Sequence, residues 1–437
     1  MSSKRVTTPS RLPRGASANA QRIANYSDET YVPIGIASVM ASGSNPPSPH
    51  ATSAADGHNH VSFGVEDQTS REESKQRHVT VLPPDQLKPK PTGSKRQIPK
   101  AFDISKTFQK CKDEHAQHMD VSRSQLTTLP ASIRELTCLH ELYLYQNKLA
   151  QLPNELGQLT ELRTLGLSEN SLTALPDTLA NLTKLRVLDL RHNKLSDIPP
   201  VVYKMTSLQT LYLRFNRIRQ VDDEVGRLTS LTMLSLRENR VVSLPPAIGR
   251  LTNLVGLDVS YNHLKSIPVD IGNCSLLQSL DLQHNELTSL PSSLGGLACL
   301  SRLGLRYNQL ESLPSTLAYC TQIIEFNIEG NTVQQLPEGL LSSLVNLQSV
   351  TLARNKFDAF PIGGPMQFRS VTSLSMELNQ VKNIPYGIFS RAECLTKLNM
   401  SINQLTSLPL DIRTWTKIVE LNLGTNQVSV RPIKTSI

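Results

Sequence analysis

Asparagine recurs every 23 or 24 residues over most of this chain. It stands at Asn147, Asn170, Asn193, Asn216, Asn239, Asn262, Asn285, Asn308, Asn331, Asn355, Asn379, Asn403 and Asn426. A common frame surrounds these positions, as in Leu142-Tyr143-Leu144-Tyr145-Gln146-Asn147-Lys148-Leu149, and a Leu-Pro step such as Leu152-Pro153 closes it. A fixed period of this length describes a row of similar units, each of which buries its apolar face only against its neighbours.

The frame is the leucine-rich repeat signature, and it predicts an α/β fold. We expect a curved, horseshoe-like solenoid with a parallel sheet on its concave face, made of about fourteen units over residues 119–428. Ser124 takes the asparagine position in the first unit. The leucines of the frame point inward, and the proline marks the turn toward the outer wall because it has no N–H to give to a sheet. Proteins of this kind mostly bind other proteins.

The repeated asparagines, which we call the ladder asparagines, are assigned a structural role. A polar residue at a buried turn satisfies backbone groups that would each cost about 1–3 kcal/mol if left unpaired. The assignment covers Asn147, Asn170, Asn193, Asn216, Asn239, Asn262, Asn285 and Asn308.

The segments outside the repeats differ in composition. Residues 1–98 are rich in Ser, Pro, His and charge and poor in large apolar residues, so they predict a disordered arm. Residues 102–118 predict a short amphipathic helix that caps the solenoid, with Asp103 or Ser105 available to cap its start. Residues 429–437 leave the repeat pattern and are expected to form a non-repeat tail.

The net charge of +8 is concentrated in the arm, because residues 1–100 hold 13 Lys and Arg against 8 Asp and Glu, a difference of +5. These basic residues alternate with prolines rather than with stacking aromatics, so we expect no nucleic-acid binding. No apolar run approaches the roughly 18 residues of a membrane span, and the start of the chain lacks a secretory signal, so we expect a cytoplasmic protein without direct membrane insertion.

The sequence gives no support for catalysis. The ten histidines are scattered, and no Gly-rich phosphate loop, Cys/His pair or zinc-ligand spacing is visible. We therefore predict a non-enzyme with no catalytic residues, no metal and no cofactor.

The strand residues between the inward leucines point out of the concave wall, where they are free to serve binding. Three arginines fall in register on successive units and form what we call the arginine column, about 10 Å long. Arg and Tyr are common at interaction hot spots, so the column predicts an acidic partner such as the switch face of a small GTPase. The candidate surface comprises Arg191, Arg214, Arg237, Tyr143, Tyr145, Asp189 and Tyr212, and a second cluster comprises His284, Arg306 and Tyr307.

The arm contains His60-Val61-Ser62-Phe63. On an extended strand Val61 and Phe63 point the same way, so this segment could add to the edge of a partner's sheet while both apolar side chains fill pockets.

Beyond the general frame, residues 120–428 resemble the suppressor-of-clear family, the leucine-rich repeat scaffolds of Ras signalling. The resemblance includes concave residues that the frame does not dictate. It is carried by Glu141-Leu-Tyr-Leu-Tyr-Gln-Asn-Lys-Leu149, Leu188-Asp-Leu-Arg-His-Asn-Lys-Leu195, Leu211-Tyr-Leu-Arg-Phe-Asn-Arg217, Leu303-Gly-Leu-Arg-Tyr-Asn308 and Phe389-Ser-Arg-Ala392.

This resemblance implies a scaffold that holds a GTP-loaded Ras-family GTPase and the catalytic subunit of type-1 protein phosphatase, so that an inhibitory phosphate is removed from Raf kinase and the MAP-kinase pathway is activated. It implies recruitment to the membrane through Ras, with the nucleus as a second compartment. Arg191, Arg214 and Arg237 match the family's Ras-facing arginines, with Tyr143, Tyr145 and Asp189 in the neighbouring surface. Val61 and Phe63 match its phosphatase-docking motif, in which His60 replaces the usual basic residue.

Two expectations accompany this reading. The family continues for several more repeats, so the chain resembles a C-terminally shortened form. The alternative function is a leucine-rich repeat adaptor of another class, at cell junctions or as a substrate receptor for ubiquitin ligases.

Overall fold

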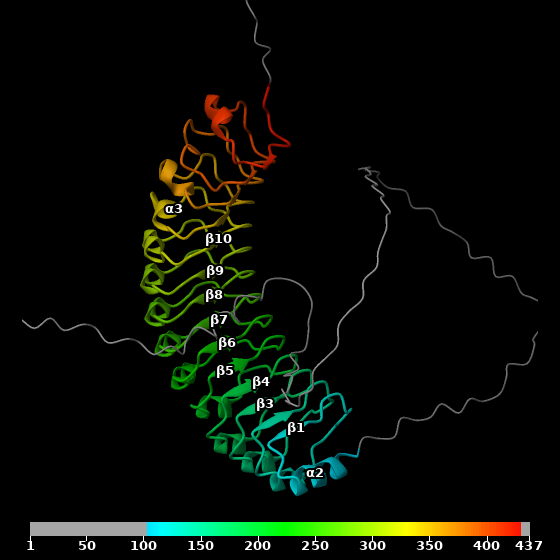
Figure 1. The fold of residues 1–437 in the computed structure, drawn as a ribbon. Coiled ribbons are helices and arrows are strands. Elements are labelled where there is room, and N and C mark those ends of the chain that lie inside the picture. Colours follow the sequence, from blue (N-terminus) through cyan, green and yellow to red (C-terminus); the bar gives the residue numbers. More distant parts are fainter. Residues whose placement is uncertain (1–102, 430–437) are drawn as a thin grey trace, which may run out of the picture. The chain divides into compact units, whose positions relative to one another are not determined.

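The computed structural model describes residues 103–429. These residues contain a 14-stranded parallel sheet in which every strand lies beside its neighbours in the sequence (Figure 1). The strands are β1 His118–Asp120, β2 Glu141–Tyr143, β3 Thr164–Gly166, β4 Val187–Asp189, β5 Thr210–Tyr212, β6 Met233–Ser235, β7 Gly256–Asp258, β8 Ser279–Asp281, β9 Arg302–Gly304, β10 Glu325–Asn327, β11 Ser349–Thr351, β12 Ser373–Ser375, β13 Lys397–Asn399 and β14 Glu420–Asn422. The predicted leucine-rich repeat solenoid is confirmed.

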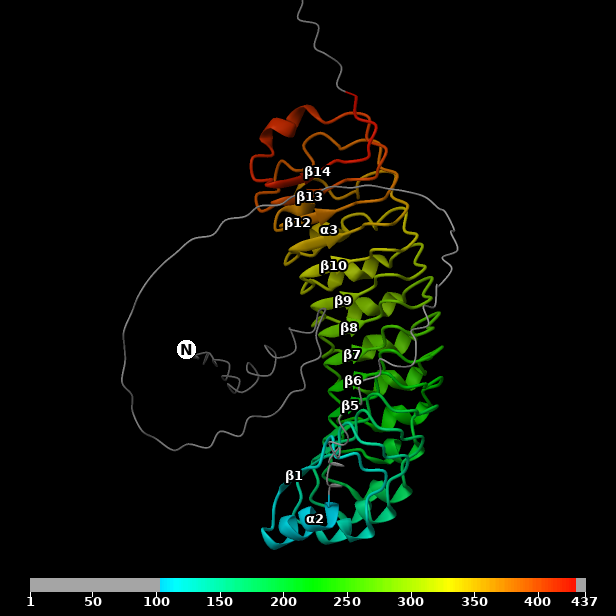
Figure 2. The same ribbon diagram turned by 90° about the vertical axis from the view of Figure 1, so that its right-hand side faces the viewer.

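Short helices line the wall opposite the strands, and the strands follow one another along the inner wall (Figure 2). Most of these helices begin directly after a proline in extended conformation, such as Pro153 with φ −73° and ψ 149°. The 3-10 helices are η2 Ala131–Glu135, η3 Asn154–Gln158, η4 Asp177–Asn181, η5 Pro200–Lys204, η6 Asp223–Arg227, η7 Pro246–Arg250, η8 Val269–Asn273, η9 Ser292–Gly296, η10 Ser315–Tyr319, η11 Pro365–Phe368 and η12 Leu410–Thr414, and one repeat has the α-helix α3 Leu340–Ser343.

The helix before the repeats, α2, spans Ile104–Asp113 and is shorter than the range 102–118 suggested by the sequence. Asp103, rather than Ser105, caps it by accepting a hydrogen bond from the Lys106 amide. Phe108 and Cys111 of α2 are buried in the same core as the first repeats. The chain then enters β1 at His118, so the last residue of the suggested helix range belongs to the sheet.

The core is a continuous stack of aliphatic side chains between the sheet and the outer helices. Leu188 and Leu190, for example, are fully buried. Each contributes about 1.5–3 kcal/mol because it leaves water completely. The regular packing fixes the register, since each middle leucine of a strand pairs with that of the next, as Leu188 pairs with Leu211.

Each ladder asparagine joins two repeats through backbone groups. Asn193 accepts a hydrogen bond from the Leu172 amide at 2.9 Å, and its Nδ2 donates to the carbonyls of Leu167 at 3.0 Å and Leu190 at 3.1 Å. The same pattern recurs at Asn239 and at Asn379. These bonds satisfy turn groups that the sheet leaves unpaired.

The residue directly before each ladder position adopts a left-handed backbone. His192, Phe215 and Tyr261 have φ values of 52°, 57° and 55°, and Gly330 takes the same place with φ 70°. Bulky residues enter this region rarely. The left-handed turn therefore changes the direction of the side chain before each ladder position. Strand alternation alone does not predict this direction.

Candidate functional site

The arginine column lies directly after three adjacent strands, β4, β5 and β6. Asp189 of β4 pairs with Tyr212 of β5, and Tyr212 pairs with Ser235 of β6, so the arginines two residues after each of these positions follow the same register. Beyond the strands, the His192 amide donates to the Arg214 carbonyl, and the Phe215 amide donates to the Arg237 carbonyl, both at 3.0 Å. The backbone thus keeps Arg191, Arg214 and Arg237 one strand spacing apart.

Arg191 is fixed by a carboxylate. Its Nε donates to Asp189 Oδ1 at 2.9 Å and its Nη2 donates to Oδ2 at 2.7 Å, and its amide also donates to Oδ1 at 3.1 Å. The Asp189 side chain is only 5% exposed. A two-point pair of this kind sets the plane of the guanidinium as well as its position.

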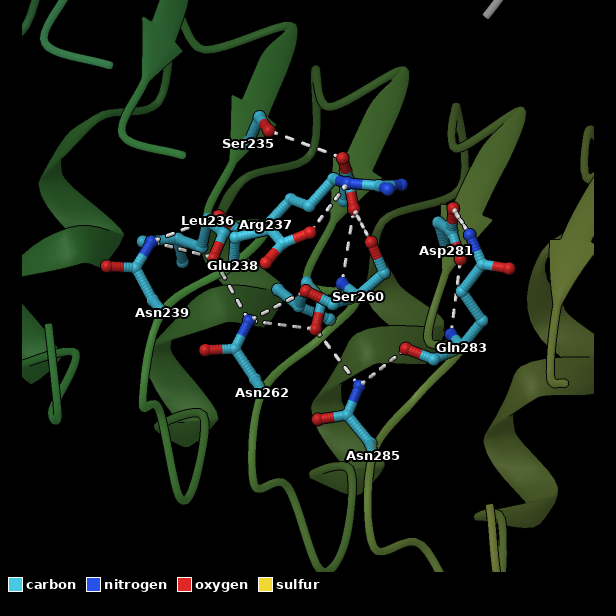
Figure 3. Close-up of polar contacts among 12 residues, drawn as sticks. Ser235, Leu236, Arg237, Glu238, Asn239, Ser260, Asn262, Asp281, Gln283 and Asn285 are labelled. Carbon is cyan, nitrogen blue, oxygen red and sulfur yellow. Dashed lines mark hydrogen bonds and ion pairs between the residues drawn. The ribbon is translucent and has the colours of Figure 1, made fainter. Parts of the chain in front are cut away.

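Arg214 and Arg237 are held differently. The Nε atom of each is buried and has no hydrogen-bond partner. Arg237 forms a long ion pair of 3.9 Å with Glu238 (Figure 3). Burial, followed by the charges of Arg237 and Arg191, holds the pKa of Arg214 below its ordinary value, although an arginine remains charged at neutral pH. The column therefore concentrates positive charge on side chains that are largely withdrawn from water.

The predicted tyrosines border the column on the β2 side. The rings of Tyr143 and Tyr145 lie 5.4 Å apart, and the Tyr143 hydroxyl donates to Glu141 at 3.2 Å. The Tyr145 ring covers Gly166 so closely that a Cβ there would collide with it. Burial and then the Asp189 carboxylate raise the pKa of Tyr145, which places Tyr145 within electrostatic reach of the carboxylate that holds Arg191.

Tyr212 completes the predicted set. The Arg191 guanidinium lies 5.2 Å from the centre of its ring. The structure therefore brings the three tyrosines into one neighbourhood with the arginine column, whereas Asp189 is buried against Arg191.

Sequence reasoning missed Phe215 and Tyr261, two aromatic residues at left-handed positions. The Arg214 guanidinium lies 4.9 Å from the centre of the Phe215 ring, and the Arg237 guanidinium lies 4.5 Å from that of Tyr261. The signal was present in the sequence, because these residues immediately precede Asn216 and Asn262. It could have been found by comparing the same position across all repeats.

The second predicted cluster, His284, Arg306 and Tyr307, does not form a single contact group in the structure. His284 and Tyr307 stack with ring centres 4.5 Å apart, whereas Arg306 donates to Gln283 Oε1 from Nε at 3.1 Å and from Nη2 at 2.9 Å. Gln283 in turn donates to Asp281 Oδ2 at 3.0 Å (Figure 3). Burial and then Asp258, which pairs with it across the strands, raise the pKa of Asp281 to about 6.

Two further observations concern metal binding and membrane insertion in the described region. Residues 103–429 contain no group of three His, Cys, Asp or Glu side chains that could hold a metal ion. No helix in this part of the chain is long and apolar enough to cross a membrane. The docking residues Val61 and Phe63 suggested by the sequence lie outside the described residues.

Comparison with known proteins agrees with the fold. Residues 154–235 match the family model described as a leucine-rich repeat region, and residues 252–310 match the leucine rich repeat model. A leucine-rich repeat protein of Leptospira interrogans is 27% identical, with a TM-score of 0.59 over 75% of this chain and 94% of that one. An internalin of Listeria monocytogenes, at 22% identity and a TM-score of 0.62 over 75% and 94%, supports the fold alone.

The chain has the leucine-rich repeat fold, which typically serves as a non-catalytic scaffold for protein interactions. Among its homologues are two named leucine-rich repeat protein soc-2 homolog. The one from Nematostella vectensis is 53% identical over 78 residues, which is 18% of this chain and 13% of that protein. The one from Drosophila erecta is 49% identical over 135 residues, which is 31% and 20%. The matched segments thus span a fifth or less of these two relatives.

Proposed function

We propose that the chain is a non-catalytic scaffold that binds a GTP-loaded Ras-family GTPase through its concave face. The site comprises Arg191, Arg214, Arg237, Tyr143, Tyr145, Asp189 and Tyr212. The observation that carries this proposal is the arginine column, in which three arginine side chains lie in register on adjacent repeats and are partly exposed. A carboxylate-rich partner surface would pair with the exposed parts of these guanidiniums, and close charge pairs across an interface can couple strongly.

The partner is inferred from the resemblance to the suppressor-of-clear family, together with the similarity to the soc-2 homologues. In this proposal the type-1 phosphatase catalytic subunit docks on Val61 and Phe63. The two bound proteins then act together on Raf, which is dephosphorylated and activates the MAP-kinase pathway. Recruitment to the membrane follows from the lipid-anchored GTPase rather than from a membrane segment of this chain.

Size-exclusion chromatography of the full chain with both partners tests the proposal. We expect all three proteins to co-elute when the GTPase carries a GTP analogue and the GTPase to elute separately when it carries GDP. Replacing Val61→Ala and Phe63→Ala together should release the phosphatase and leave the GTPase bound. Co-elution that ignores the nucleotide, or no co-elution at all, would contradict the proposed function.

A further inference from the structure

Each guanidinium of the arginine column lies over an aromatic ring. The distances from the guanidinium carbon to the ring centre are 5.2 Å for Arg191 and Tyr212, 4.9 Å for Arg214 and Phe215, and 4.5 Å for Arg237 and Tyr261. These distances are within the range in which a cation is attracted to the face of a ring.

The rings under Arg214 and Arg237 are themselves supported by other rings. Phe215 stacks on His192 with centres 4.2 Å apart and planes at 18°. Tyr261 stacks on His284 at 4.1 Å and 16°, and His284 stacks on Tyr307 at 4.5 Å. Burial lowers the pKa of both histidines, which favours their uncharged form and so limits repulsion of the arginines. We call these two groups the ring stacks.

The fold does not require aromatic residues at these positions. Phe215 and Tyr261 occupy the left-handed turn with φ 57° and 55°, where other repeats carry Gln146, Glu169 or Gly330. A bulky ring gains nothing from this backbone, since glycine and asparagine enter it more readily. We therefore infer that the aromatic side chains of Phe215 and Tyr261 have a role other than forming the turn.

An arginine held by an aromatic ring differs from one held by a carboxylate in the number of N–H donors that remain available. Arg191 already gives two of its side-chain N–H groups to Asp189. A guanidinium that rests on a ring face keeps its N–H donors, because the attraction acts through the π surface. Arg214 and Arg237 are thus oriented without a close two-point carboxylate pair of the kind that holds Arg191.

We propose that Phe215 and Tyr261 are positioning residues, which hold the Arg214 and Arg237 guanidiniums in place to receive carboxylates of the partner. This inference rests on the proposed GTPase site. Its physical basis is preorganisation: a long side chain that is ordered before binding loses less entropy when the complex forms. The rings need not touch the partner.

The test uses Phe215→Asn and Tyr261→Asn, because asparagine tolerates the left-handed turn and leaves the net charge unchanged. We expect each variant to release the GTP-loaded GTPase about 3- to 10-fold faster by surface plasmon resonance, with the association rate and its salt dependence unaltered. The conservative variants Phe215→Tyr and Tyr261→Phe should restore slow release. Leu378→Asn, at an exposed left-handed position with φ 53°, is the matched control and should change nothing.

A second measurement is independent of the partner. In the free protein, NMR relaxation of the Arg214 and Arg237 Nε groups should show greater mobility in the corresponding asparagine variants than in the wild type. Unchanged mobility, or unchanged release of the GTPase, would overturn the positioning role. If the wild type fails to bind the GTPase while the arginine mobility changes as expected, the proposed function fails and the positioning effect stands.

Discussion

Charged side chains on the concave surface are held differently in two regions that share the same repeat frame, the region after β4–β6 and the region from β10 onward. After β4–β6, the Nε atoms of Arg214 and Arg237 have no hydrogen-bond partner, and ring faces support both guanidiniums. From β10 onward, charges pair with each other across the repeats, as in Arg354 with Glu329 at 3.2 Å and Lys397 with Glu420 at 2.8 Å. The same frame therefore supports charges that pair with each other and, at Arg214 and Arg237, charges that lie over ring faces, and only the second arrangement favours an acidic partner.

The largest expected effect on stability comes from the ladder asparagines, which both regions share. Asn239→Ala and Asn379→Ala each remove hydrogen bonds to four backbone groups, three carbonyls and one amide. We expect each to lower the free energy of unfolding by about 2–4 kcal/mol in guanidinium chloride titrations. If Asn239→Ala instead removed one binding partner with no loss of stability, the structural assignment of the ladder would be wrong.

A smaller effect separates the two regions. Asp189→Asn breaks an ion pair in which the carboxylate is almost fully buried, and should cost about 1–3 kcal/mol. Glu420→Gln breaks a pair whose side chains are 57% and 63% exposed, and should change stability by no more than about 0.5 kcal/mol. Thermal unfolding at equal ionic strength measures both. Equal losses would mean that burial does not distinguish the two kinds of pair.

The pH dependence of stability sharpens the comparison at Asp281, between the two regions. Its pKa of about 6 in the folded protein exceeds the ordinary value of about 3.9. The folded chain therefore holds its proton longer than the unfolded chain, and the associated stability is lost as pH rises from about 4 to about 6. Asp281→Asn cannot lose a proton, so its stability relative to the wild type should rise by about 1–3 kcal/mol between pH 4 and pH 7.

Denaturant titrations at several pH values measure this difference. Glu311→Gln, which changes an exposed carboxyl group in a nearby repeat, is the control and should follow the wild type. A constant offset between Asp281→Asn and the wild type would contradict the raised pKa.

The repeat fold could be predicted because one frame dictates leucine burial, strand register and the ladder asparagines in every unit. The sequence also predicted which arginines form the column, since strand alternation places Arg191, Arg214 and Arg237 in register. The contacts of Phe215 and Tyr261 with the arginines did not follow, because alternation ignores the left-handed turn that brings these two rings beside Arg214 and Arg237. Nor could the sequence distinguish Arg191, paired with Asp189, from its two neighbours, since that difference depends on side-chain conformation.

The most direct test of the arginine column is charge reversal in each region. Isothermal titration calorimetry would compare the wild type, Arg214→Glu and Arg354→Glu for binding to the GTPase loaded with a GTP analogue. We predict a loss of about 100-fold or more for Arg214→Glu and less than about 3-fold for Arg354→Glu, with both melting close to the wild type. Wild-type affinity in Arg214→Glu would contradict the claim that this column is where the partner binds.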